Sequence, residues 1–146
     1  MTVEFTNNFR LVRGQLNDKM HTNVRKAAMY LEGEVKRAIG SGKKSGKTYP
    51  VPGTNRTYTA SAPGETPAVM MSDYMNSITH AVKSSTNEIT GTVGTNMAQA
   101  KRLEFGFVGT DKKGRKYNQA PRPHLKVTYE KHREKIRKIL SERVNF

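Results

Sequence analysis

The sequence of 146 residues contains no cysteine and no tryptophan, and aromatic side chains make up only 8% of it. Without cysteine the chain forms neither disulfides nor thiolate metal sites, and this composition fits folding in a reducing compartment. No apolar run approaches the roughly 18 residues that a membrane-spanning helix needs, so we expect no membrane span. The first ten residues have no basic start followed by an apolar stretch, so we expect no secretion signal.

Apolar and acidic residues are also scarce. Hydrophobic residues make up 34% of the chain, which is little for a chain that buries its own core. Either a long segment lies outside the core, or part of the apolar surface is buried against partners. The 12 Asp and Glu residues face 26 Lys and Arg residues, which gives a net charge of +14. Such a field attracts nucleic acid or an acidic protein surface, although a solvated basic face without a dedicated partner is an alternative.

Two segments carry apolar residues at three- and four-residue steps, a period that is typical of amphipathic helices. Residues 9–39 are predicted to form one long helix, with Gly40 as its stop. A basic amphipathic C-terminal helix is predicted from His124 to Val144, preceded by Pro121 and Pro123. The apolar stripe of this second helix consists of Leu125, Tyr129, His132, Ile136, Ile139, Leu140 and Val144.

Residues 40–70 show no such period. This segment holds four of the six prolines and five glycines, and it has few aliphatic side chains. A connection of this length is too long for an ordinary loop inside a compact domain. We therefore expect a long Gly/Pro-rich extended loop that is either disordered alone or ordered by a partner.

The second half of the chain carries strand signals. Apolar and polar residues alternate over 78–82 and again over 87–95, which predicts an antiparallel hairpin with a turn-like cluster between the two strands. Residues 100–108 are predicted to form a third strand ending at Gly109, and residues 110–119 to form a basic exposed loop. The order of helix, long loop, small antiparallel sheet and helix predicts an α+β fold in a single domain spanning residues 1–146.

The sequence offers little catalytic or metal-binding chemistry. The segment Gly42–Thr48 resembles a phosphate-binding loop, but Ser41 stands where that motif needs glycine. The histidines lack the spacing of a zinc peptidase, and the carboxylates are scattered along the chain instead of clustered for magnesium. We therefore predict that the protein is not an enzyme and uses no cofactor or metal. A hydrolase whose carboxylates converge only in space is the alternative.

Glu104 has two interpretations. It lies between Leu103 and Phe105 and follows Lys101 and Arg102. It is either a partly buried carboxylate that pairs with a basic residue and fixes a strand or a subunit contact, or a solvated position on a half-exposed strand. The local sequence alone favours the solvated position.

Five short segments follow one another along the chain at characteristic spacings. They are Ser45-Gly46-Lys47-Thr48-Tyr49, Ala60-Ser61-Ala62-Pro63-Gly64-Glu65-Thr66-Pro67-Ala68, Ser72-Asp73-Tyr74-Met75-Asn76-Ser77-Ile78, Glu104-Phe105-Gly106 and Ala120-Pro121-Arg122-Pro123-His124-Leu125. In this order they resemble the motifs of the tail-completion proteins of long-tailed bacteriophages, also called head–tail joining or minor tail proteins. The resemblance covers about residues 10–144. The chain departs from the family pattern at Ser72, Tyr74 and His124, and by an inserted proline before Arg122.

This resemblance implies a structural virion protein. Such proteins form a ring, usually a hexamer, at the head-proximal end of the tail, and they join the tail tube protein to the head-completion or stopper connector. DNA passes through the ring and makes non-specific contacts with it. The implied location is the tail or neck of the virion, with assembly in the host bacterial cytoplasm. The alternative function is a free-standing basic nucleic-acid-binding module, whose binding would weaken steeply with salt.

We predict two sets of contact residues on this basis. The subunit or tube interface is predicted to contain Tyr49, Tyr58, Pro63, Glu65, Glu104, Phe105 and Arg122. Contacts with DNA in the lumen, or with an acidic partner, are predicted for Lys43, Lys44, Lys47, Arg56, Lys112, Lys113, Arg115 and Lys116.

Overall fold

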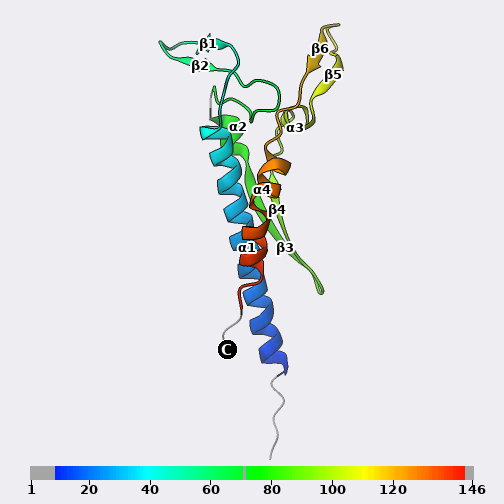
Figure 1. Cartoon of the computed structure of the whole chain (residues 1–146). Coiled ribbons are helices and arrows are strands. Elements are labelled where there is room, and N and C mark those ends of the chain that lie inside the picture. The colour runs from blue at the N-terminus through cyan, green and yellow to red at the C-terminus, as the bar shows by residue number, and fades with distance from the viewer. Residues whose placement is uncertain (1–8, 71, 144–146) are drawn as a thin grey trace, which may run out of the picture.

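A helix of 33 residues, α1 (Phe9–Ser41), is the element against which most of the chain packs. The computed structural model describes residues 9–70 and 72–143. At 1.5 Å per residue α1 is about 50 Å long, and Figure 1 shows it running along most of the molecule. The helix predicted over residues 9–39 is confirmed.

The prediction that Gly40 stops this helix is wrong. The helix continues through Ser41, and Gly40 is not among the glycines with a positive φ angle. Gly40 faces the short helix α2 (Asp73–Ser77), where an added Cβ atom would lie only 3.3 Å from the sulfur of Met75. The glycine therefore lets α2 approach the end of α1 closely.

The strands form three separate antiparallel hairpins, so the fold is α+β as predicted, with the sheet divided into three parts. The hairpins pair β1 (Thr48–Pro50) with β2 (Thr57–Thr59), β3 (Thr79–Ser84) with β4 (Ile89–Gly94), and β5 (Phe107–Thr110) with β6 (Lys116–Gln119). The hairpin predicted over 78–82 and 87–95 is confirmed as β3–β4. Figure 1 shows β1–β2 and β5–β6 projecting from one end of the molecule, while β3–β4 lies along α1.

The β3–β4 hairpin packs one face on α1. At Gly91 the strand comes so close that an added Cβ atom would lie 2.9 Å from the side chain of Val24. Nearby, Nδ1 of His80 lies 2.5 Å from the Glu32 carboxylate, which also accepts a hydrogen bond from Lys36. A glycine and an ion-pair cluster therefore fix this hairpin on the helix.

The C-terminal helix α4 (Leu125–Leu140) lies antiparallel beside α1. Its last turn is bound by the buried side chain of Asn23, whose amide donates to the carbonyls of Leu140 and Glu142 at 3.3 and 3.0 Å. Halfway along, the Tyr30 hydroxyl lies 2.8 Å from Nδ1 of His132. The helix is confirmed but ends at Leu140, and the predicted end at Val144 lies outside the described residues.

The fully buried core is small. Val35 and Ile39 of α1 pack with Ile78, which follows α2, and each is at most 1% exposed. Partly buried apolar residues surround this cluster, namely Leu31, Val69, Tyr74, Met75, Val93 and Leu125. The core thus lies where α1, α2, β4 and the start of α4 meet.

The prediction of a third strand over residues 100–108 is wrong. Residues Ala100–Phe105 form the short helix α3, and β5 begins only at Phe107. Ala, Lys, Arg, Leu and Glu are all good helix formers, and the alternation of Leu103 and Phe105 was too short to separate a strand from one and a half helical turns. Gly106, with a φ angle of +77°, ends the helix and lets the chain reverse.

Both segments predicted as loops contain hairpins. Within residues 40–70, Pro52 and Gly53 occupy the centre of a turn in which Thr54 N donates to Val51 O, and Gly53 has a φ angle of +74°. Proline followed by a left-handed glycine is typical of a type II turn. Within 110–119, β6 covers residues 116–119 and leaves a short turn at the tip. The expectation that residues 40–70 lack internal order is therefore wrong.

The molecule exposes more surface than a compact monomer of its size. The accessible area is 11240 Å², against about 7,500 Å² expected for 16.4 kDa. The twelve residues outside the described ranges could contribute at most about 2,000 Å², so an excess remains. This excess agrees with the scarcity of apolar residues and with the projecting hairpins.

The small core makes the fold sensitive to single cavities. We expect Ile78→Ala to lower the free energy of unfolding by about 2–5 kcal/mol, because it removes a fully buried side chain. Val127→Ala is the matched control, because Val127 is 53% exposed on α4, and it should change stability by less than about 0.5 kcal/mol. Urea unfolding followed by circular dichroism measures both. Equal effects of the two variants would show that Ile78 is not part of the core.

Candidate functional site

Four of the five segments that resemble tail-completion motifs come together at one place. We call it the junction, and it comprises residues 61–65, Tyr74, residues 103–106 and residues 120–125. Figure 1 shows α2, α3, the start of α4 and the segment after β2 meeting at this point, just below the two projecting hairpins. The arrangement depends on three groups of polar contacts.

The first group centres on Glu104, which is 8% exposed at the end of α3. One oxygen of its carboxylate accepts from the backbone amides of His124 and Leu125 at 2.9 and 3.1 Å, and the other accepts from Lys126 N at 3.0 Å. These are amides of the first turn of α4, which have no partners within the helix. A carboxylate here also interacts favourably with the helix dipole.

This environment keeps Glu104 charged. Burial alone raises the pKa of its carboxyl group, but the three backbone amides and the nearby His124 outweigh burial, and the pKa lies below its ordinary value of 4.5. Of the two sequence interpretations, the solvated position is therefore wrong. Glu104 is a buried carboxylate on a helix, and it fixes the start of another helix.

The second group extends from Glu104 through the imidazole of His124 to Tyr74. His124 is 0% exposed, and its Nδ1 lies 3.0 Å from the carbonyl of Arg122 and 3.1 Å from Glu104. Both neighbours are acceptors, so Nδ1 carries a proton, and Nε2 lies within hydrogen-bond distance of the Tyr74 hydroxyl, at 2.7 Å. Burial, with the Glu104 charge, raises the pKa of Tyr74 to about 12.

The third group joins the segment after β2 to the segment before α4. The guanidinium of Arg122 donates to the hydroxyl and carbonyl of Ser61 at 2.7 and 3.0 Å. Arg122 N donates to Leu103 O at 2.6 Å, and Gly64 N donates to Pro121 O at 3.0 Å. Arg122 is therefore held within its own chain and links segments 61 residues apart.

Glu65 joins the segments that precede β1 and follow β2. Pro63 and the left-handed Gly64 form a turn in which Glu65 N donates to Ala62 O. The Glu65 carboxylate then accepts from Ala62 N at 2.8 Å and from the amide and hydroxyl of Ser45 at 2.9 and 2.6 Å. The hydrogen bonds from Ser45 and Ala62 lower the pKa of Glu65 to about 2.

The glycine of the Glu-Phe-Gly segment is required by the fold. Gly106 has a φ angle of +77°, and an added Cβ atom would lie 2.7 Å from Gln119 O and 3.1 Å from Pro121. Both the backbone conformation and the close approach of the β6 end exclude a side chain. The motif residues of the junction thus position main-chain segments.

The predicted interface residues divide into two groups. Glu65, Glu104 and Arg122 have partners within the chain, as described above. Tyr49 and Tyr58 stack across the β1–β2 hairpin with ring centroids 5.8 Å apart, and Tyr49 is 45% exposed. Pro63 is exposed on its turn, and Phe105 is 75% exposed on α3. The exposed group retains surface for a partner.

The predicted DNA-contact residues lie around the two projecting hairpins. Six are exposed, namely Lys43, Lys47, Arg56, Lys112, Lys113 and Lys116. Lys44 is half-buried and donates to the Thr66 hydroxyl at 2.6 Å, and burial lowers its pKa. Arg115 is exposed but pairs with Asp111 at 2.7 Å. Contact of any of these residues with DNA remains a prediction.

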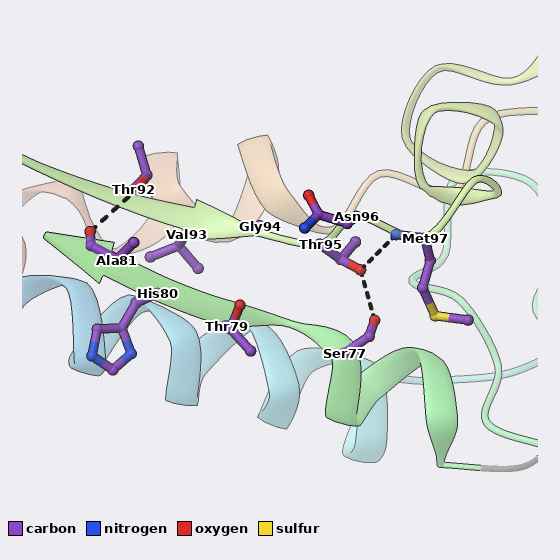
Figure 2. Close-up of a pocket in the computed structure, with 10 residues that line it drawn as sticks. All are labelled: Ser77, Thr79, His80, Ala81, Thr92, Val93, Gly94, Thr95, Asn96 and Met97. Atoms are coloured by element: carbon purple, nitrogen blue, oxygen red, sulfur yellow. Dashed lines mark hydrogen bonds between the residues drawn. The ribbon is translucent and has the colours of Figure 1, made fainter. Parts of the chain in front are cut away.

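A concavity of about 720 Å³ lies on the β3–β4 hairpin and the segment that follows it (Figure 2). Its lining carries small and hydroxyl side chains, and the hydroxyls of Ser77 and Thr95 bond to each other at 2.7 Å. His80 is the titratable side chain of this lining, and its imidazole is engaged by Glu32 of α1. The concavity therefore does not present an acid–base pair.

The described residues contain no group of three or more His, Asp or Glu side chains placed to hold a metal ion. Within the same ranges, no helix is both long and apolar enough to cross a membrane. In comparisons with known proteins, no family model, no curated protein and no solved structure matches this chain.

Sequence reasoning missed several residues of these contacts. Ser61, Tyr74 and His124 carry no local pattern that indicates a buried hydrogen bond, because their partners come from distant segments. Asp111 did carry a signal: its carboxylate accepts from Lys113 N and Arg115 N, both at 2.9 Å, across the β5–β6 turn. Aspartate followed three residues later by glycine is typical of such turns.

The capping role of Glu104 predicts a pH-dependent stability. We expect Glu104→Gln to lower the free energy of unfolding at pH 7 by about 1–3 kcal/mol, because an amide nitrogen must then face a backbone N–H. Since the folded-state pKa lies below 4.5, the contribution of the carboxylate is fully present above that value and is lost as the pH falls through the folded-state pKa.

The difference between the wild type and the variant should therefore shrink as the pH falls from 5 through the folded-state pKa of Glu104, as measured by urea unfolding at each pH. Glu130→Gln is the control, because Glu130 is exposed on α4, the helix that Glu104 caps. A stability difference at Glu104 that stays constant over this range would contradict the charged cap.

Proposed function

We propose that this protein is a structural component of a bacteriophage virion that forms a ring at the head-proximal end of the tail. In this proposal the ring joins the tail tube to the head connector, and DNA passes through it. The protein performs no catalysis in this role. The proposal extends the motif resemblance with the contacts that the motif residues make in the structure.

The observation that carries the proposal is that the motif residues hold main-chain segments in position. Segments far apart in the sequence meet at the junction, and their polar side chains bind main-chain groups of one another. An enzyme motif would place reactive groups around a substrate cavity. Here the motifs hold two hairpins that project from one end, which suits a subunit whose function lies in its contacts.

The excess of exposed surface supports association with other subunits. A ring subunit can bury part of its apolar area against its neighbours, so it needs a smaller core of its own. The exposed large apolar side chains include Phe105 and Val108, at 75% and 78% exposure. Such side chains mark contact surfaces when they gather in one region.

The cations at the hairpins support contact with DNA. Lys112, Lys113 and Lys116 stand at the tip of β5–β6, while Lys47 and Arg56 flank β1–β2. Contacts with phosphates need no base recognition, and they would let DNA slide through a channel. The same cations favour the second candidate function, a free-standing nucleic-acid-binding module.

The two candidate functions predict different oligomeric states in solution. For the ring adaptor we expect a monomer or weak oligomer alone, and a ring when the tail tube protein of the same phage is added. Light scattering after size exclusion measures the mass in both conditions. A monomer in both conditions that instead shifts on adding short duplex DNA at physiological salt would contradict the adaptor and favour the nucleic-acid module.

The β1–β2 hairpin can be removed with little damage to the fold. Its ends already meet, because Gly46 N donates to Ala60 O at 2.8 Å. We expect a variant in which two glycines replace residues 47–59 to unfold within a few degrees of the wild type and to lose binding to the tail tube protein. Melting curves and co-sedimentation measure the two properties.

Asn55→Ala is the control for this variant, because it changes only an exposed position of the hairpin turn. Unfolding of the shortened chain would show that the hairpin supports the core. Unchanged binding by the shortened chain would place the tube contact elsewhere.

A further inference from the structure

One apolar groove remains open along the body of the molecule. It has a volume of about 310 Å³ and lies between α1, β4 and α4. Its floor and walls include Val24, Ala28 and Leu31 of α1, Val93 of β4, and Tyr129 and Leu140 of α4. Most of the residues that line it are apolar, and Glu88, Thr90 and Tyr129 are the ones with polar side-chain atoms.

The groove also borders an open strand edge. β4 pairs with β3 on one side, and the described residues place no strand on its other side. Tyr129 and Leu140 are 41% and 45% exposed although they line the groove. The groove is therefore open for a protein segment that fills it with apolar side chains.

The same chain carries two highly exposed apolar side chains of the kind that such a groove binds. Phe105 at the end of α3 and Val108 in β5 are the two most exposed of its large apolar side chains in the described ranges, and we call them the apolar knob. Figure 1 shows α3 and β5 at the end with the projecting hairpins, while α4 and β4 face each other farther down the body. The knob and the groove thus belong to different surfaces of one copy.

Charge near the two surfaces is also complementary. Glu88 is the charged residue of the groove lining, and no described residue forms an ion pair with it. Lys101 is exposed on α3 beside the knob and likewise has no ion-pair partner among the described residues. In a chain with 12 acidic residues and a net charge of +14, an acidic position at the rim favours a basic partner such as another copy.

We propose that the apolar knob of one copy docks in the groove of a second copy, with Glu88 and Lys101 facing each other across the contact. The contact joins two different surfaces, so repetition of it is head to tail, and it generates a closed ring when the rotation between copies closes. This inference rests on the proposed function and names the surfaces through which that ring forms.

The absence of cysteine makes the contact directly testable by disulfide trapping. The full-length double variant Thr90→Cys with Lys101→Cys places one cysteine at the groove and one beside the knob, both at exposed positions, and it leaves Phe105 and Val108 in place. On oxidation at rising protein concentration we expect a ladder of covalent dimers, trimers and larger species. Lys101→Cys alone can give only dimers. The control pair Thr90→Cys with Asn55→Cys keeps the groove cysteine and moves the other to the β1–β2 turn, and it should give no ladder.

A second measurement does not depend on disulfide geometry. Phe105→Ala should weaken self-association by about tenfold to hundredfold, which corresponds to the burial of one large apolar side chain. Because Phe105 is exposed in the single copy, the melting temperature of the monomer should not change. Val127→Ala, at another exposed apolar position of the chain, should leave self-association unchanged.

The failure of this inference differs from the failure of the proposed function. If the Thr90/Lys101 cysteine pair gives no ladder in a sample that forms rings with tail tube protein, the ring uses other surfaces and the inference is overturned. A ladder equal in both cysteine pairs would also overturn it, because random collision would then explain the trapping. If no ring forms with the tube protein, the proposed function fails, whatever the trapping result.

Discussion

The arrangement of the chain around its junction depends on one buried carboxylate. Glu104 satisfies three backbone amides at the start of α4, and by doing so it fixes α3, which carries it, against the first turn of a helix 20 residues later. From this point α4 runs back along α1, while β5 leaves α3 in the opposite direction. A side chain that bonds main-chain groups imposes both position and direction, because the first-turn amides point along the helix axis. The imidazole of His124 and the hydroxyl of Tyr74 continue the same network to α2, so three helices share one set of buried polar contacts.

The junction separates the body of the protein, which consists of α1, α4 and β3–β4, from its extensions, which are the β1–β2 and β5–β6 hairpins. The body has few fully buried apolar residues, and its stability depends on the close contact of α1 with α4 and β3–β4. The extensions are held at their bases, by Glu65 on one side and by Gly106 and Arg122 on the other, while their tips remain exposed. This division suits a subunit that must keep its own shape while its tips and its groove meet other molecules. In such a subunit, a substitution at the junction and a substitution at a tip should have different effects, the first on folding and the second on assembly.

The elements whose sequence pattern repeats many times could be predicted from the sequence. The contacts that depend on distant partners could not. The helical period over 9–39 and the alternation over 78–95 repeat often enough to identify α1 and β3–β4. Over residues 100–105 the alternation depended on Leu103 and Phe105 alone, and these two positions fit a strand and a short helix equally well. The burial of Glu104 could not be predicted, because its partners lie 20 to 22 residues away and are backbone amides. The two Pro-Gly turns were visible in the sequence as Pro52-Gly53 and Pro63-Gly64, and the first of them would have indicated the β1–β2 hairpin.

The division of the sheet into three two-stranded hairpins has a consequence for aggregation. Every strand is an edge strand within the described part of the chain, and open edges invite pairing with other chains. In each hairpin one strand contains a residue that opposes such pairing, namely Pro50 in β1, Lys83 in β3 and Lys116 in β6. The partner strands β2, β4 and β5 contain neither proline nor a charged residue. Each hairpin can therefore accept a neighbour on one side only, which permits a finite contact between copies and opposes the unlimited stacking of strands into a fibre.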